Sequence, residues 1–342
     1  MLKYFKGSII LSLLGAVCAF GVGHYYSGTS AGGFSALFLA LVLSVLEVSL
    51  SFDNAVVNAI VLKKMTPLWQ HRFLTWGIAI AVFGMRLIFP LALVGVMARI
   101  NPLDALVLAA TKPDEYAKIM LSAHVSIASY GGAFLMMVAL KYFFDEAKDI
   151  HWISVIERPI AKLGRIESVS IGFTILFLYF FSLAQKGPDV MTFIVSGLWG
   201  LITYIIVDGI GAFLQTPGEE QGPDLHKASM GMFLYLEVLD ASFSFDGVVG
   251  AFAITNNLFI IMIGLGVGAM FVRSLTIMLV DKGTLSEFRY LEHGAFYAIG
   301  ALALIMFAGT VYHIPEVFTG LIGAALIGLS LWSSINFNKK NA

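Results

Sequence analysis

The stretch LEVSLSFDNAVVNA, residues 46–59, places Glu47 and Asp53 inside a run that is otherwise apolar enough to cross a membrane. A charged carboxylate at the middle of a bilayer costs on the order of 2.5 to 3.5 kcal/mol on insertion scales. Such residues persist in a membrane helix only where they are paired, protonated, hydrated or bound to a cation. The stretch therefore predicts a membrane helix that carries a functional site.

The composition of the whole chain is that of a polytopic membrane protein. Of its 342 residues 58% are hydrophobic and 13% are charged, and the mean hydropathy is +0.87, values outside the range of soluble domains of this length. The net charge is −1 and the basic residues are dispersed, which argues against a nucleic-acid partner. Cys18 is the only cysteine, so an internal disulfide and a thiolate-built metal centre are excluded.

Counting about 20 apolar residues as one crossing predicts an all-α protein with ten transmembrane helices. Fifteen Lys and Arg residues then fall on one side and four on the other, which predicts a multi-pass protein of the cell membrane with both termini cytoplasmic. The first helix is expected to remain uncleaved because no clear small-x-small cleavage site follows it. The ten expected spans are residues 8–26, 33–62, 71–99, 124–144, 169–185, 190–214, 229–256, 257–281, 292–311 and 315–334.

The chain 1–342 forms one transmembrane domain in which the opening motif recurs. Residues 240–246, DASFSFD, match residues 47–53, EVSLSFD, at both serines, the second phenylalanine and the last aspartate. Two further similarities follow in the same order: Gly77 and Gly264 each precede an arginine by nine residues, and GGAFLMMVAL from 131 resembles HGAFYAIGAL from 293. These matches predict two three-helix units, at 34–144 and 229–311, joined in part by a polar cytoplasmic linker at 145–168 that is either solvated or a surface helix.

The two units begin five crossings apart and so enter the membrane from opposite sides, which predicts an inverted repeat. Inverted repeats with interrupted helices are typical of secondary transporters, whose substrate site lies near the middle of the bilayer.

The two motifs place five candidate acidic residues inside the membrane: Glu47, Asp53, Glu237, Asp240 and Asp246. Asp53 lies six positions after Glu47, an offset of about 120° on an ideal helix. The helix must therefore unwind between them if both face one ion, and the serines of the two motifs suit such a segment. The supporting residues expected around the acids are Ser51, Ser244, Arg86 and Arg273, with Asp208 nearer the cytoplasmic end of its span.

The donors in and around the two motifs are carboxylates, serine hydroxyls and the amides of Asn54 and Asn58. These hard oxygen ligands suit magnesium, calcium or manganese(II) better than copper or zinc. The alternative is an internal ion-pair network in which Arg86 and Arg273 only lock the helices together, although two arginines cannot neutralise five acids. Both interpretations hold if an arginine occupies the acids whenever the metal is absent.

The segment from Glu47 to Asn54, E-x-x-L-S-F-D-N, and the segment from Glu237 to Asp246, E-x-x-D-x-x-F-x-x-D, resemble the two signatures of the TerC family of bacterial membrane proteins. The resemblance extends over residues 34–310, and the chain departs from the pattern in having Gly247 after the last aspartate. It implies a fold related to the LysE transporter superfamily, an association with tellurite resistance and, in some members, manganese export. The metal ligands that it implies are Glu47, Asp53, Asn54, Glu237, Asp240 and Asp246.

The function expected from these observations is export of a divalent cation, manganese in preference to calcium, with protons as the counter-ion and no organic cofactor. The chain is not expected to be an enzyme. Two other functions stay open: a non-transporting scaffold or metal sensor in a stress-response complex, and an intramembrane aspartyl hydrolase. Against the hydrolase, neither Asp208 in VDGIG nor Asp246 in SFDGV follows a Gly-x-Gly sequence.

Overall fold

The computed structural model describes residues 2–77, 79–166, 168–215, 225–283 and 287–341, and within these ranges every regular element is a helix. The first half contains α1 (Leu2–Ser27), α2 (Ser30–Leu50), α3 (Phe52–Leu62), α4 (Pro67–Arg72), the π-helical η1 (Phe73–Gly77) and η2 (Ile80–Ile88), α5 (Phe89–Ala98), α6 (Pro102–Thr111), α7 (Pro113–Ser122) and α8 (His124–Phe143). The second half contains α9 (Ser154–Leu163), α10 (Val169–Ser182), α11 (Asp189–Gln215), α12 (Leu225–Ile254), α13 (Leu258–Asp281), α15 (Leu291–Gly309) and α16 (Glu316–Asn341).

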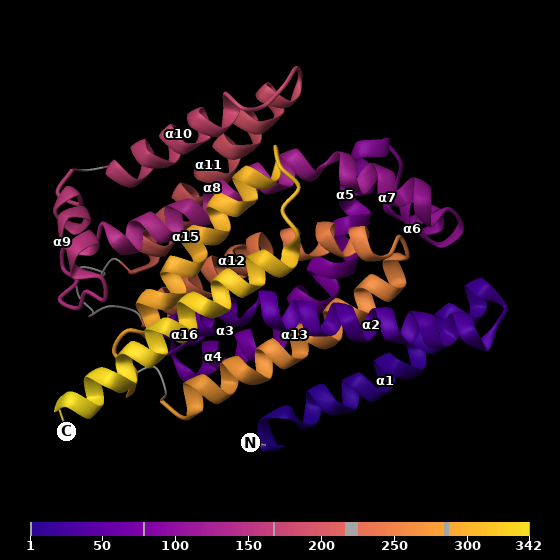
Figure 1. Cartoon of the computed structure of the whole chain (residues 1–342), viewed down its shortest axis with the longest axis horizontal. Coiled ribbons are helices and arrows are strands. Elements are labelled where there is room, and N and C mark those ends of the chain that lie inside the picture. The colour runs from indigo at the N-terminus through magenta and orange to yellow at the C-terminus, as the bar shows by residue number, and fades with distance from the viewer. Residues whose placement is uncertain (1, 78, 167, 216–224, 284–286, 342) are drawn as a thin grey trace.

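Eight helical segments of the described residues are long and apolar enough to cross a membrane, so the chain is a multi-pass membrane protein. They correspond to eight of the ten expected spans. Of the other two, α10 has only 14 residues, and α12 is long enough at 30 residues but carries the acidic residues of the second motif. The long helices run along the long axis of the molecule, with α9 and the C-terminus at one end and α5, α6 and α7 toward the other (Figure 1).

The expected span at 33–62 is interrupted at Ser51, which separates α2 from α3. Ser51 has φ −103° and ψ 17°, and its N–H still donates to the Glu47 carbonyl at 2.9 Å. The break is therefore one residue long, a change of direction and not an extended unwound loop. The matching break expected in the second motif is absent, because α12 is continuous through residues 240–246.

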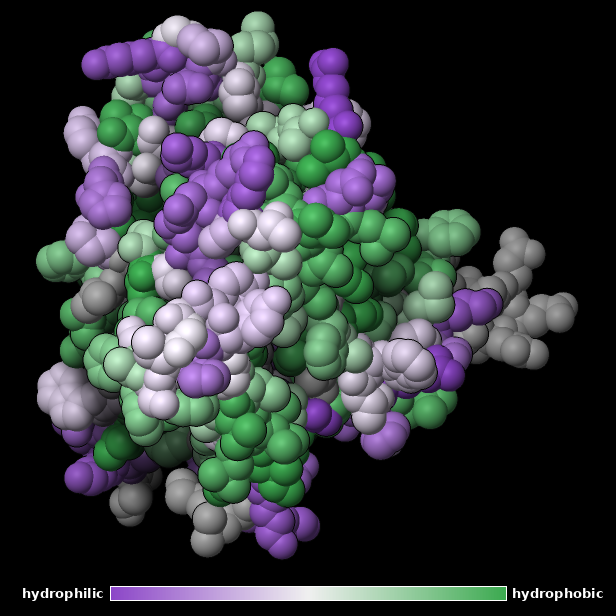
Figure 2. All heavy atoms as spheres, turned by 90° about the vertical axis from the view of Figure 1, so that its right-hand side faces the viewer, coloured by the Kyte–Doolittle hydropathy of each residue, from purple (hydrophilic) through white to green (hydrophobic). Residues whose placement is uncertain are grey.

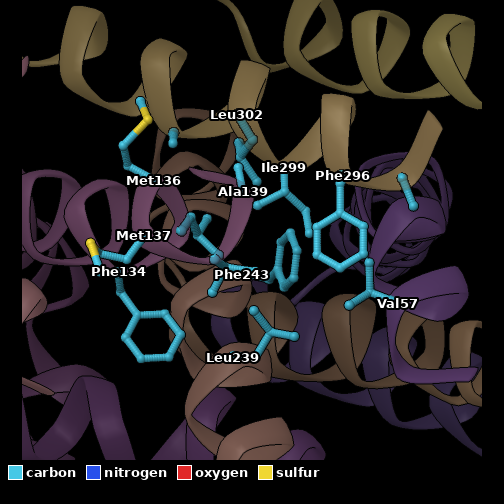
Figure 3. Packing of buried hydrophobic residues seen from close by; sticks show 14 of the residues in the cluster. Val57, Phe134, Met136, Met137, Ala139, Leu239, Phe243, Phe296, Ile299 and Leu302 are labelled. Carbon is cyan, nitrogen blue, oxygen red and sulfur yellow. The ribbon is translucent and has the colours of Figure 1, made fainter. Parts of the chain in front are cut away.

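A buried apolar cluster joins α3, α8, α12 and α15. Phe243 of α12 lies close to Leu239 and to Phe296 and Ile299 of α15 (Figure 3). Val57 of α3 adds to the same cluster and is fully buried. Close van der Waals packing of this kind holds membrane helices together, so the cluster joins the two halves of the chain. It also fixes α3 against α12, the two helices that carry the acidic motifs.

Helix α13 packs closely against α2 through glycine. A Cβ atom on Gly264 would lie 2.6 Å from the Cβ of Leu43, and a Cβ on Gly268 would lie 2.5 Å from the Cβ of Glu47. Small residues allow membrane helices to approach in this way. The sequence GLGVG is therefore a packing surface that brings α13 to the acidic residue of α2.

The helix that carries Arg86 departs from regular α-helical geometry. Residues 73–77 and 80–88 are π-helical, with wider turns than an α-helix. π-Helical turns are rare and are frequent at functional sites because they shift side chains out of the regular register. Here they belong to the segment that carries Arg86 to the centre of the protein.

The connection at 145–168 is not simply a solvated linker, since it contains α9, and Glu157 of that helix is completely buried. Residues 100–123, between the expected spans 71–99 and 124–144, likewise contain two short helices, α6 and α7.

The end of the molecule at the right of Figure 1 is seen face-on in Figure 2. Hydrophilic and intermediate residues run there from the top to the middle, flanked by hydrophobic residues on the right and below.

Candidate functional site

A cavity of about 40 Å³ lies where α2, α3, η2, α12 and α13 meet. Apolar side chains such as Val82 and Val272 form part of its wall, and the remaining wall is polar. The polar side chains that line it are Glu47, Ser51, Asn54, Asn58, Arg86, Asp240, Arg273 and Thr276.

Glu47 is held on one side of this cavity by charge. Its carboxylate forms an ion pair with Arg86, and both side chains are 5% exposed. Ser51, the residue at the helix break, donates its Oγ–H to Glu47 Oε1 at 3.1 Å. This hydrogen bond helps to hold the carboxylate in place. The second oxygen, Oε2, faces α12, where a Cβ on Gly247 would lie 3.5 Å from it.

Asp240 is held on the other side by two amides. Nδ2 of Asn54 and Nδ2 of Asn58 donate to Asp240 Oδ1 at 2.6 and 3.0 Å. The two asparagines are four residues apart and so share one face of α3. Their own amide oxygens, Asn54 Oδ1 and Asn58 Oδ1, are buried and have no hydrogen-bond partner among the described residues.

Glu237 and Arg273 lie near the cavity, and neither forms an ion pair with a described side chain. Glu237 Oε1 is buried with no hydrogen-bond partner in the described part of the chain, and it packs against Gly77, where a Cβ would lie 2.5 Å from that oxygen. Arg273 donates to the backbone carbonyl of Leu74. In the alternative ion-pair network Arg86 thus has its acid, whereas Arg273 forms no ion pair with a carboxylate of the described side chains, among which Asp246 is not included.

Asp53 does not line the cavity. It begins α3, accepts the Asn54 N–H at 2.9 Å, and faces α16, where a Cβ on Gly323 would lie 3.8 Å from Asp53 Oδ2. A break of one residue at Ser51 is too small to turn Asp53 toward the site of Glu47. The side chain of Asp246, expected as a ligand, lies outside what the structure describes.

Asp208 and Ser244 also lie outside the central cavity. Asp208 forms an ion pair with Lys141 at 2.5 Å in a larger cavity near the linker. Ser244 is buried in α12. Neither is in a position to contact an ion between Glu47 and Asp240.

Among the described side chains no group of three or more histidine, cysteine, aspartate or glutamate residues is arranged to hold a metal ion. The cavity has room for about one water molecule or a single ion and is lined by oxygen donors, with the Arg86 guanidinium beside Glu47. Arg273 was the residue of α13 expected here from the sequence; Thr276 and the close-packing Gly268 were not, because neither belongs to an acidic motif.

Comparison with known families decides where the chain belongs. Residues 52–341 match the profile of a family described as "Protein of unknown function (DUF475)". The chain belongs to the DUF475 family. The assignment to TerC drawn from the acidic motifs is therefore wrong, and so is the expectation of a fold related to the LysE superfamily that rested on it. The two motifs cover only a few residues, and a membrane helix that binds charge can produce such a spacing in unrelated families.

No curated protein and no solved structure is significantly similar to this DUF475 chain. The family match begins at residue 52. It thus includes Asn54, Asn58, Arg86 and Asp240 of the central cavity and stops short of Glu47.

Two larger cavities of this DUF475 protein lie at opposite ends of α8, α12 and α15. One, of about 530 Å³, is lined by the start of α8 at His124 and by the ends of α12 and α15. The other, of about 720 Å³, is lined by the end of α8 and by the starts of α12 and α15. Asp240 lies between them along α12, about 8 Å from Tyr235 of the second cavity and about 14 Å from Val249 of the first at 1.5 Å per residue.

Proposed function

We propose that this protein is a membrane transporter that exports a divalent cation, manganese or calcium, across the cell membrane. The observation that carries the proposal is the central cavity, which Glu47 of α2 and Asp240 of α12 both line, with the partnerless amide oxygens of Asn54 and Asn58 among the described residues beside them. Carboxylate, amide and hydroxyl oxygens are the ligands that hard divalent cations take. Buried carboxylates inside a membrane protein mark ion pathways more often than structural contacts.

Arg86 supports a cycle in which the arginine and the cation alternate. With no cation bound, the guanidinium neutralises Glu47, and the amides of Asn54 and Asn58 stabilise Asp240. An arriving cation would displace Arg86 and turn the two amides so that their oxygens face the metal. Glu47 is then neutralised at both stages, by Arg86 without the cation and by the cation when it is bound, as a buried charge requires.

The two large cavities support alternating access. They flank the central cavity at opposite ends of the same three helices, so closing one and opening the other would expose the cation to one side at a time. The repeated motifs on α2 and α12 meet at the site, as the two halves of an inverted repeat do in secondary transporters. The excess of Lys and Arg at the linker end supports cytoplasmic termini, and protons are the counter-ion we propose.

Flux across vesicles of known orientation tests the proposal and identifies the ion. Purified protein is reconstituted with a metal-sensitive dye and a pH dye inside, and manganese, calcium, magnesium and zinc are supplied in turn. We expect manganese or calcium to enter with opposite movement of protons, and zinc to be transported least. Absence of flux for all four ions with folded protein would favour a scaffold or sensor that binds without transporting.

A further inference from the structure

The helix α9 lies outside the membrane-spanning segments and exposes apolar side chains. Val155 is 85% exposed, Ile156 49% and Leu163 39%. A helix fully surrounded by water normally turns such residues toward the protein. The apolar face of α9 is therefore suited to an environment other than water.

The opposite face of α9 is fixed to the protein by a buried carboxylate. Glu157 accepts the N–H of Ile153 at 3.0 Å and Nζ of Lys148 at 3.2 Å, and His293 Nε2 of α15 lies 3.4 Å away. Burial acts to raise the pKa of Glu157, but the Ile153 N–H and the charges of His293 and Lys148 bring it below its ordinary value. Glu157 and Ala161 are one turn apart and both buried, so the rotation of α9 about its own axis is set.

The exposed half of α9 divides into a cationic edge and an apolar edge. At 100° per residue Arg158 and Lys162 lie about 40° apart, and Val155, Pro159, Leu163 and Ile156 occupy roughly the next 100°. Arg158 and Lys162 are exposed, and neither is within ion-pair distance of a carboxylate in the described residues. The helix thus presents two free cations beside an apolar strip.

The position of α9 places this face at the membrane surface. Only five residues lie between its last residue, Leu163, and Val169, where α10 begins. Helix α10 exposes large apolar side chains such as Tyr179 and Phe180, as a lipid-facing helix does. Ile166, between the two helices, is 59% exposed. In Figure 1 α9 runs across the direction of the long helices at the end of the molecule. An amphipathic helix lying in the plane of the interface has this geometry.

We propose that α9 is an interfacial helix that inserts its apolar strip into the membrane surface and binds anionic lipid headgroups through Arg158 and Lys162. Cytoplasmic leaflets carry the anionic lipids that attract such cations, and the linker lies on the side richest in Lys and Arg. The continuity of the apolar strip with the lipid-facing surface of α10 favours lipid over a protein partner. The inference is independent of what the central cavity transports.

The test places a reporter on the apolar strip of the full-length protein. In a protein carrying Cys18→Ser, a cysteine introduced by Val155→Cys is labelled with an environment-sensitive fluorophore and reconstituted into phosphatidylcholine vesicles with or without phosphatidylglycerol. The matched control is Ala147→Cys in the same background, which labels an exposed site of the same linker. Vesicles that carry the reporter on their outer surface are compared for quenching by aqueous iodide and by lipid-attached nitroxide.

We expect the label at position 155 to be quenched several-fold less by iodide than the label at 147, and to be quenched by the nitroxide. Phosphatidylglycerol should increase this protection, and Arg158→Glu combined with Lys162→Glu should abolish the increase. Equal iodide quenching at 147 and 155 would overturn the proposal and leave the face to solvent or a protein partner. If protection of the label from iodide is the same with and without phosphatidylglycerol, and is unchanged by the charge reversal, the assignment of Arg158 and Lys162 to lipid headgroups is overturned.

Discussion

At the scale of single residues, the central cavity depends on how each charge is balanced. Glu47 and Arg86 neutralise each other in a space from which water is nearly excluded, while Asp240 depends on two neutral amides. Removing one member of a buried ion pair leaves the other charge without compensation, at a cost of several kcal/mol. The two carboxylates therefore differ in what they require from their surroundings.

The substitution Arg86→Met is expected to destabilise the protein by about 3 to 5 kcal/mol, because Glu47 becomes a buried unpaired charge. Thermal unfolding in detergent measures the loss. Adding Glu47→Gln to the same protein should recover most of the stability, since the uncompensated charge is then removed. If the losses of unfolding free energy in Arg86→Met and in Glu47→Gln simply add in the double variant, the ion pair is contradicted.

The transported cation should substitute for the missing arginine. Manganese or calcium at about 100 times its dissociation constant should stabilise the Arg86→Met protein by about 2.7 kcal/mol, read as a rise in the unfolding midpoint. The variant with Glu47→Gln added should respond less, as it lacks a charged ligand. Magnesium and a monovalent salt of equal ionic strength serve as controls. A midpoint that is unchanged by any divalent cation would count against metal binding at Glu47.

At the scale of the helices, glycines decide how closely α2 and α13 approach. Gly268→Ala would put a Cβ 2.5 Å from the Cβ of Glu47, and overpacking of this kind costs about 1 to 3 kcal/mol. Gly328→Ala on α16 is the matched control, because no atom lies within 4 Å of its new Cβ and alanine favours a helix by about 1 kcal/mol over glycine. Thermal unfolding should show the first variant less stable and the second unchanged or more stable; the reverse order would contradict the packing.

The docking of α9 should depend on the charge of Glu157. Its pKa is lower in the folded protein than the ordinary 4.5, so its contribution is complete above pH 4.5 and is lost as the pH falls through the folded value. Glu157→Gln should remove that contribution at neutral pH, leaving Lys148 unpaired at a cost of about 3 kcal/mol. Hydrogen exchange of the α9 amides should then accelerate by about a hundredfold. Protection unchanged in the variant, or rising as the pH falls below 4.5, would contradict the assignment.

The sequence predicted the helices better than the orientation of their side chains. Apolar run length located the long helices. A break between Glu47 and Asp53 was expected only if both acids face one ion; the helix does break at Ser51, but Asp53 does not line the cavity. The size of that interruption depends on local hydrogen bonds at Ser51, and for this reason Asp53 could not be assigned to its true surroundings near α16. The burial of Glu157 could not be predicted from the sequence either, because tertiary packing brings Lys148 and His293 to its carboxylate.

At the scale of the whole molecule, the proposed transport path requires the two large cavities to open on opposite sides of the membrane. Tyr312 lines the cavity of about 530 Å³ and Asp149 lines the cavity of about 720 Å³. In a protein carrying Cys18→Ser, we expect Tyr312→Cys to react with an impermeant maleimide added outside intact cells, and Asp149→Cys to react only after the membrane is opened. Labelling of both positions from the same side would contradict the arrangement of the path.

The central claim is that a divalent cation crosses the membrane between Glu47 and Asp240, and Asp240→Asn tests it most directly. Vesicles containing this variant are compared with vesicles containing Asp189→Asn, a change of the same kind at an exposed carboxylate of α11 that lines neither the central cavity nor the two large ones. We predict that Asp240→Asn lowers manganese or calcium flux by about tenfold or more through loss of a charged ligand, while Asp189→Asn keeps most of it. Equal flux in the two folded variants would contradict the account.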